Sequence, residues 1–278
     1  MLAEKLSKFR NVTIVNDVSS NVKPIAQAGL VAKGIVYLLL GVFAFMAAFH
    51  INGQSSRNTD KTDVFGYIYH QTGGQLLLGI VTVGLFCYTL WRVIQCFADT
   101  ENKGTDLKGI ASRSRYLFSG LVYASVAVAA VKILFSKSIS GGDNQQNLAK
   151  QILSKPFGQW LLGLAAVTII IVGFYQIYYA LTEKYRKHIE RASSVSARKL
   201  MLTAGKMGYV SRGIVWLIVG WLLGKAAYHS NSSEAGDTSK AFNILGEGTF
   251  GMYILGAVGL GFVCYGAFSF IRARYERF

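Results

Sequence analysis

Long apolar segments alternate with short polar ones along the whole chain. The six apolar segments cover approximately residues 25–49, 74–98, 116–136, 157–181, 209–229 and 249–271. Each is long enough to cross roughly 30 Å of hydrocarbon as a helix, and none shows the strict alternation of a transmembrane strand. The pattern therefore predicts an all-α integral membrane protein with six transmembrane helices.

Two markers show that one helical hairpin is repeated three times. The first helix of each copy has a glycine and, three residues later, an aromatic residue: Gly34/Tyr37, Gly120/Tyr123 and Gly213/Trp216. The second helix has two glycines five residues apart: Gly74/Gly79, Gly158/Gly163 and Gly251/Gly256. Both markers recur with nearly the same spacing. Because each copy crosses twice, successive copies face the same way, which predicts a pseudo-threefold bundle of parallel hairpins.

These spacings divide the chain into segments. We expect an N-terminal tail at 1–23, hairpin repeats at 24–98, 112–182 and 205–272, a basic linker at 183–204 and a C-terminal tail at 273–278. The loop inside each repeat contains a short apolar piece, which forms either an interfacial helix or an ordinary polar loop.

Glycines are the expected helix contacts. Lipid tails are as apolar as leucine, so transmembrane helices associate by close packing, which small residues permit. The glycines expected to pack helices together are Gly34, Gly41, Gly74, Gly79, Gly120, Gly158, Gly163, Gly213, Gly220, Gly251 and Gly256.

The net charge of +15 is unevenly distributed. Residues 1–23, 99–115, 182–208 and 272–278 hold 18 Lys and Arg residues, whereas the other three loops hold six. This bias predicts that both termini are cytoplasmic. It favours contact with anionic lipid headgroups at the cytoplasmic face rather than with nucleic acid. Lys33, Arg92 and Arg212 are candidate headgroup ligands, and we expect Arg92 to snorkel to the surface.

A second set of polar residues is predicted near the outer ends of the first helices. Lys132 and Lys225 each lie twelve residues after their repeat's glycine, and His50 and His229 occupy equivalent positions four residues further on. These four residues form a candidate outer polar cluster. Either they converge on a ligand at the pseudo-threefold axis, or the lysines snorkel to lipid phosphates, which we favour because no carboxylate lies in any span.

The chain resembles a known bacterial membrane family. The segments AGLVAKGIVYLLLG (28–41), MGYVSRGIVWLIVG (207–220) and LSKPFGQWLLG (153–163) resemble the family known as domain of unknown function 1206. The resemblance implies repeated pairs of transmembrane helices over nearly the whole chain and implies no activity. The second copy departs from the pattern because it lacks the basic residue that Lys33 and Arg212 supply directly before the glycine.

The sequence predicts no catalytic residues, metal site or cofactor. We expect a non-enzymatic scaffold or accessory subunit in a bacterial cytoplasmic membrane, which contacts lipids and either another membrane protein or a second copy. The alternative is a small channel, or a bundle that binds a lipid or small ligand along the pseudo-threefold axis. Polar residues along that axis would favour the alternative.

Overall fold

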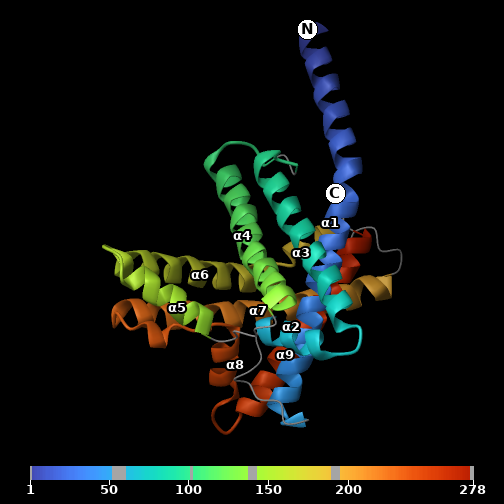
Figure 1. The fold of residues 1–278 in the computed structure, drawn as a ribbon. Helices are drawn as coiled ribbons and strands as arrows, with labels where there is room; N and C mark the ends of the chain where they lie inside the picture. The colour runs from blue at the N-terminus through green and yellow to red at the C-terminus, as the bar shows by residue number, and fades with distance from the viewer. Residues whose placement is uncertain (1, 52–60, 101–102, 137–142, 189–194, 276–278) are drawn as a thin grey trace.

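A computed structural model describes residues 2–51, 61–100, 103–136, 143–188 and 195–275 of the chain (Figure 1). Six long helices are apolar enough to span a membrane. They are α1 (Leu2–Ala48), α3 (Gly74–Phe97), α4 (Leu107–Ser136), α6 (Gly158–Leu181), α7 (Val195–Tyr228) and α9 (Gly251–Tyr275). The prediction of a six-span, all-helical membrane protein is confirmed.

Short helices precede the second span of each repeat. They are α2 (Lys61–His70), α5 (Asp143–Leu153) and α8 (Thr238–Gly246), with 3-10 turns η3 (Lys184–His188) and η4 (Ser232–Glu234) elsewhere. Each lies where the sequence placed an apolar piece. Gly74, Gly158 and Gly251 begin the spans that follow, and a Cβ on any of them would collide with backbone of the preceding turn. These three glycines therefore permit tight turns, and the prediction that they pack spans together is wrong.

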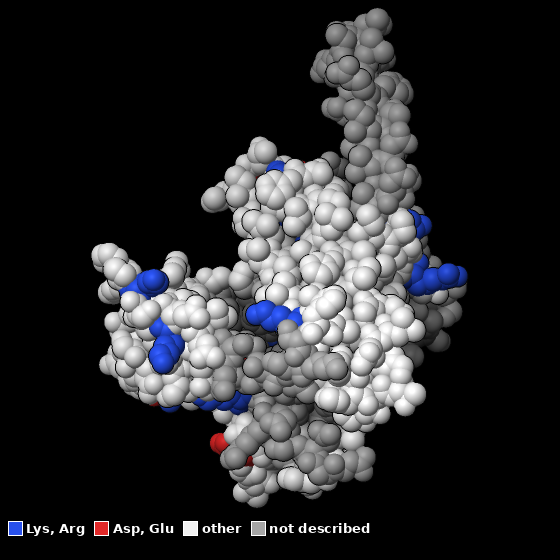
Figure 2. All heavy atoms as spheres, viewed as in Figure 1, with Lys and Arg blue, Asp and Glu red and all other residues white. Residues whose placement is uncertain are grey.

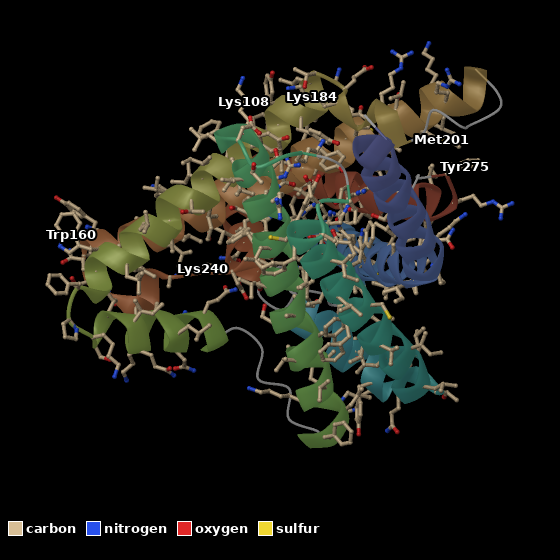
Figure 3. All side chains as sticks on the ribbon, turned by 90° about the horizontal axis from the view of Figure 1, so that it is seen from above. Lys108, Trp160, Lys184, Met201, Lys240 and Tyr275 are labelled. Atoms are coloured by element: carbon tan, nitrogen blue, oxygen red, sulfur yellow. The ribbon has the colours of Figure 1, made fainter. Side chains whose placement is uncertain are left out.

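The six spans are arranged in a ring that is open between α4 and α6. The largest interfaces join different repeats: α3 packs on α4, α6 on α7, and α9 on α1. Within the first repeat α1 packs on α3, and within the third α7 packs on α9. Figure 3 shows Lys108, Lys184, Met201 and Tyr275 gathered at one side of the molecule, which we call the linker end. The opposite side, which carries the short helices, is the loop end.

Several of the glycines lie at contacts between repeats. A Cβ on Gly34 would lie 2.7 Å from the Phe270 ring, and one on Gly41 would lie 2.5 Å from the Val263 nitrogen. Comparable contacts exist at Gly120, Gly213, Gly220 and Gly256. Gly79 is different, because a Cβ there would meet nothing within 4 Å. The prediction of a helix contact is therefore wrong for Gly79, and Gly163 has only the Cβ of Ala227 at 4.0 Å.

Candidate functional site

A cavity of about 710 Å³ lies among the spans near the linker end. All six spans contribute side chains to its wall, and the two linkers add Lys103 and Lys184. The volume falls within the range of roughly 300–1,000 Å³ that is usual for small-molecule sites.

The cavity wall is strongly basic and rich in tyrosine. Its cationic side chains are Lys33, Arg92, Lys103, Arg115, Lys184, Arg212 and Arg272, and its tyrosines are Tyr37, Tyr88, Tyr116, Tyr123, Tyr175, Tyr179, Tyr209 and Tyr265. No Asp or Glu is among the residues that line it in the described part of the chain. Buried charges normally have a partner of opposite charge, because desolvation is costly. Two of these cations, Lys33 and Arg212, are buried and have tyrosines as their described contacts.

Lys33 extends from α1 into the centre of the tyrosines. Its side chain is 3% exposed, and Nζ donates a hydrogen bond of 3.2 Å to the Tyr88 hydroxyl. The ammonium lies 4.9, 5.2 and 5.1 Å from the ring centroids of Tyr88, Tyr123 and Tyr265. Such cation–π contacts hold the cation in place without adding a negative charge.

Arg212 of α7 repeats this arrangement in the third hairpin. Its guanidinium donates a hydrogen bond to the Tyr265 hydroxyl and lies 4.3 Å from the centroid of that ring and 4.9 Å from that of Tyr37. Lys33 and Arg212 both directly precede an anchor glycine, and Tyr88 and Tyr265 both lie fourteen residues after the glycine that begins their span. Repeats one and three thus share a basic residue paired with a tyrosine.

Arg92 of α3 joins the first pair from the second helix. Its guanidinium donates to the Tyr88 hydroxyl at 2.8 and 2.6 Å and to the Gln95 side-chain oxygen at 2.6 Å. It is partly buried rather than extended to the surface. The prediction that Arg92 snorkels is therefore wrong. Lys33, Arg92 and Arg212 do come together, but they point into the bundle.

The second repeat lacks the basic–tyrosine pair. Counting from the same glycines, Ser119 stands in place of Lys33 and Arg212, and Val172 stands in place of Tyr88 and Tyr265. The two helices also make no interface comparable to those of α1 with α3 or α7 with α9. Near the linker end a long side chain bridges them, with the Arg115 guanidinium 4.8 Å from the Tyr175 ring centroid.

Side-chain size explains why the second hairpin is open. A Cβ on Gly29 would lie 2.6 Å from the Tyr88 Cα, and a Cβ on Gly208 would lie 2.6 Å from the Tyr265 Cβ. These glycines let the two helices of each hairpin touch. Arg115 occupies the equivalent position in repeat two, which prevents the same approach.

A second contact position shows the same substitution. Gly84 packs against Ala32 in repeat one, and Gly261 packs against Ser211 in repeat three. The equivalent residues in repeat two are Thr168 and Phe118. Both contact positions of repeat two thus carry larger side chains than the closed hairpins tolerate.

Three polar atoms at the cavity wall are buried without a hydrogen-bond partner. Among the described residues, these are the Tyr123 hydroxyl, Gln176 Oε1 and Arg212 Nε. Arg212 is 9% exposed and Gln176 is 8% exposed. An unsatisfied buried polar group costs about 1–3 kcal/mol. A bound molecule that accepts from the guanidinium and donates to the amide oxygen would remove this cost.

Both linkers are fixed where they reach the cavity. The Asp99 carboxylate accepts hydrogen bonds from the backbone N–H groups of Lys103 (2.7 Å) and Gly104 (2.8 Å), which lowers the pKa of that carboxyl. In the other linker the Tyr185 hydroxyl donates to the Leu202 carbonyl at 2.7 Å, and burial raises its pKa to about 12. Lys103 and Lys184 are therefore held beside the cavity by ordered turns.

The predicted outer polar cluster lies outside this cavity. The exposed His229 ring forms an ion pair of 2.8 Å with Glu234, and Lys225 Nζ lies 5.2 Å from the Trp221 ring centroid. Lys132 and His50 are exposed. None of the four lines the cavity. No group of three or more potential metal ligands occurs among the residues that the structure describes.

The tyrosines, Gln176 and Arg272 were missed as site residues by sequence reasoning. Aromatic residues in spans are usually packing or interfacial residues, so they give little signal alone. The useful signal was positional: Tyr88 and Tyr265 are equivalent, and each belongs to a repeat with a basic residue before its anchor glycine.

Comparison with known proteins agrees with the repeat structure. The family model described as "Domain of Unknown Function (DUF1206)" matches three times, at residues 28–99, 115–183 and 207–276. The "Uncharacterized protein YxxB" of Bacillus subtilis (strain 168) is 28% identical over 257 residues, which cover 92% of this chain and 91% of that protein. No solved structure matches the chain. With three matched segments that together cover most of its length, the chain belongs to the DUF1206 family.

Proposed function

We propose that this protein binds an anionic ligand in the cavity between its six spans. One observation carries the proposal: seven basic side chains and no acidic one line the cavity in the described part of the chain. Five of these cations lie within spans, where an ionisable group is expensive and is usually retained for function. An anion would supply a countercharge to Lys33 and Arg212, whose described contacts are tyrosines. The role proposed is binding, not catalysis.

We further propose that the linker end, where the cavity lies, faces the cytoplasm. The distribution of Lys and Arg supports that orientation, with both termini in the cytoplasm of a bacterium. A reporter fused after Phe278 should be active only in the cytoplasm, and one inserted in the loop 231–247 only outside. A C-terminal reporter that is active outside would show that the orientation in the membrane is the opposite.

The cavity favours this ligand-binding role over that of a scaffold or accessory subunit. Lipid-facing helices suffice for a scaffold, which does not require buried cations enclosed by tyrosines, such as Lys33 and Arg212. A channel is not supported, since Lys33 and Arg212 are enclosed by tyrosine rings rather than arranged along an open pore. Cations enclosed by tyrosine rings suit a ligand that remains bound better than an ion that passes through.

The test is an unfolding measurement on the full chain in a neutral detergent. Inorganic pyrophosphate and phosphatidate are added separately, and the unfolding temperature is followed by tryptophan fluorescence. At least one probe should raise it, because a ligand that binds only the folded state stabilises that state. Lys33→Met should abolish the rise, whereas Lys132→Met, the same change at an exposed lysine outside the cavity, should preserve it. Equal responses of the two variants would contradict the proposal.

A further inference from the structure

The cavity has an apolar side where the second hairpin is open. On α4 the wall is formed by Phe118 and Val122, and on α6 by Ile171 and Val172. Ile171 is 61% exposed, so this part of the wall is continuous with the outer surface of the spans. Figure 2 shows a recess between the lobe of α5 and α6 and the rest of the molecule. The interior of the cavity is cationic, but its lateral opening is lined by hydrocarbon side chains.

We propose that the ligand is a membrane lipid whose phosphate head carries at least two negative charges, and that it reaches the cavity sideways between α4 and α6. This inference rests on the proposed function and specifies its ligand. The phosphate lies against Lys33, Arg92 and Arg212, and the acyl chains extend between α4 and α6 into the bilayer.

The charge of the head follows from two buried cations inside the spans, Lys33 and Arg212. Lys33 and Arg92 share the Tyr88 hydroxyl, and Arg212 binds the neighbouring Tyr265. Tyrosine hydroxyls and rings orient these cations but bring no formal charge. A singly charged diester head would neutralise one cation, whereas a phosphomonoester neutralises up to two. Arginine also matches the geometry of phosphate oxygens, which it binds with two parallel N–H groups.

The proposal that the ligand has acyl chains rests on residues that differ in repeat two. Ser119 and Val172 replace the basic–tyrosine pair of the other two hairpins. The cation–ring contact between α4 and α6 is instead that of Arg115 with Tyr175, nearer the linker end, and the wall beyond it is apolar. Arg115, Phe118 and Thr168 stand at the positions where the other repeats have the small residues of their helix contacts. An opening between two spans, apolar at membrane depth, admits a chain from the bilayer.

A soluble phosphate compound carries the same charged group as the lipid head and is the alternative ligand. It would pass Lys103 and Lys184 at the linker end, where the cavity wall is polar. The two routes predict different effects of filling the lateral opening. A bulky side chain at the opening excludes the chains of a lipid and leaves a soluble phosphate unaffected.

The experiment compares Ile171→Trp with Val167→Trp in the full chain in detergent. Val167 precedes Ile171 by one helical turn, is 53% exposed and does not line the cavity, so it is the matched control. Phosphatidate, phosphatidylglycerol, phosphatidylcholine and soluble glycerol 3-phosphate are titrated, and binding is followed by thermal stabilisation and by native mass spectrometry. Phosphatidate should bind more tightly than phosphatidylglycerol, and phosphatidylcholine should not bind.

Ile171→Trp should weaken phosphatidate binding by about tenfold, the effect of one bulky group in space that a ligand needs, while Val167→Trp leaves it unchanged. If glycerol 3-phosphate stabilises the protein as well as phosphatidate does, or if both Trp variants bind phosphatidate like wild type, the lipid inference is overturned and the anion site stands. If no phosphate compound binds, or if phosphatidylcholine binds as well as phosphatidate, both proposals are overturned. Val172→Tyr, which fills the same opening from a half-buried position, provides an independent second variant.

Discussion

The first and third hairpins are closed, whereas the second is open, although all three derive from one repeated pattern. In the closed hairpins a glycine brings the first helix against the tyrosine-bearing turn of the second, at Gly29 with Tyr88 and at Gly208 with Tyr265. The second hairpin has Arg115 at that position and lacks the tyrosine. The comparison teaches that helix packing and small contact residues go together: the two hairpins with small residues at both contact positions are closed, and the hairpin with larger ones is open.

The largest expected effect comes from breaking a closed hairpin. Gly29→Leu or Gly208→Leu places a side chain where a Cβ alone would lie within 2.7 Å of tyrosine backbone. We expect a loss of about 3 kcal/mol in the free energy of unfolding, at the upper end of the usual cost of overpacking. The measurement is thermal or denaturant unfolding of the purified protein. Gly79→Leu is the control and should be close to neutral, because nothing lies within 4 Å of that position. Equal costs at Gly29 and Gly79 would show that the close contact does not hold the hairpin.

Replacing Arg212, the cation of a closed hairpin, should change the free energy of unfolding by a smaller amount. In the ligand-free protein the change should be stabilising. Arg212→Met removes a buried charge and its unpaired Nε while keeping most of the volume. We expect the ligand-free protein to gain about 1 kcal/mol, because replacing buried charge by an apolar side chain is often stabilising. The same variant should lose stabilisation by phosphatidate. Unfolding curves with and without phosphatidate measure both effects, and a destabilised ligand-free variant would argue that Arg212 is structural.

Giving the open hairpin the small residues of the closed ones should draw α4 and α6 together. The variant combines Arg115→Gly, Phe118→Ala and Thr168→Gly, which copies the contact positions of repeat one. Spin labels at the exposed positions Lys132 and Leu161, in a background without the three cysteines, report the distance between the helices. The mean distance should shorten and its distribution narrow. An unchanged distribution would mean that side-chain size at these positions does not hold the hairpin open.

The smallest effect is expected at the loop end, where the closed hairpins differ from each other. In repeat three the hydrogen bond from His229 lowers the pKa of Glu234, whereas the sequence of repeat one has Ser55 at the position equivalent to Glu234. A carboxyl with a lowered folded-state pKa stabilises the protein above its unfolded pKa, near 4.3, and loses that contribution as the pH falls through the folded value. Glu234→Gln should therefore flatten the pH dependence of the unfolding temperature below about pH 5 and change little at pH 7. If the unfolding temperatures of the wild type and of Glu234→Gln fall in the same way below about pH 5, the His229–Glu234 pair does not contribute to this pH dependence.

The fold was well predicted from the sequence because the features that indicate it, apolar segments and glycines, recur at regular spacings. Six apolar segments and two glycine markers define six spans, three repeats and several inter-repeat contacts, such as those of Gly34 and Gly41. The prediction was wrong at Gly79 because a glycine in an apolar helix does not show which face meets a neighbour. That face is decided by the ring of helices, which the sequence does not display.

The candidate site was predicted only in part. Lys33, Arg92 and Arg212 were selected, but they were directed towards surface headgroups because a basic residue near a helix end usually snorkels. Their real partners lie far along the chain: Tyr88 is 55 residues from Lys33, and Tyr265 is 53 from Arg212. Alignment of the three copies at Gly29, Arg115 and Gly208 would have indicated that the second hairpin differs.

The covalent linkage of three hairpins in one chain has a consequence for how such an opening can arise. If the same bundle were a trimer of identical hairpins, any substitution would appear three times, and the ring would have either three openings or none. Tandem duplication releases one copy from that constraint. Two copies retain their internal helix contacts, and the remaining copy is free to differ, which on the proposed lipid route is the copy that opens to the bilayer.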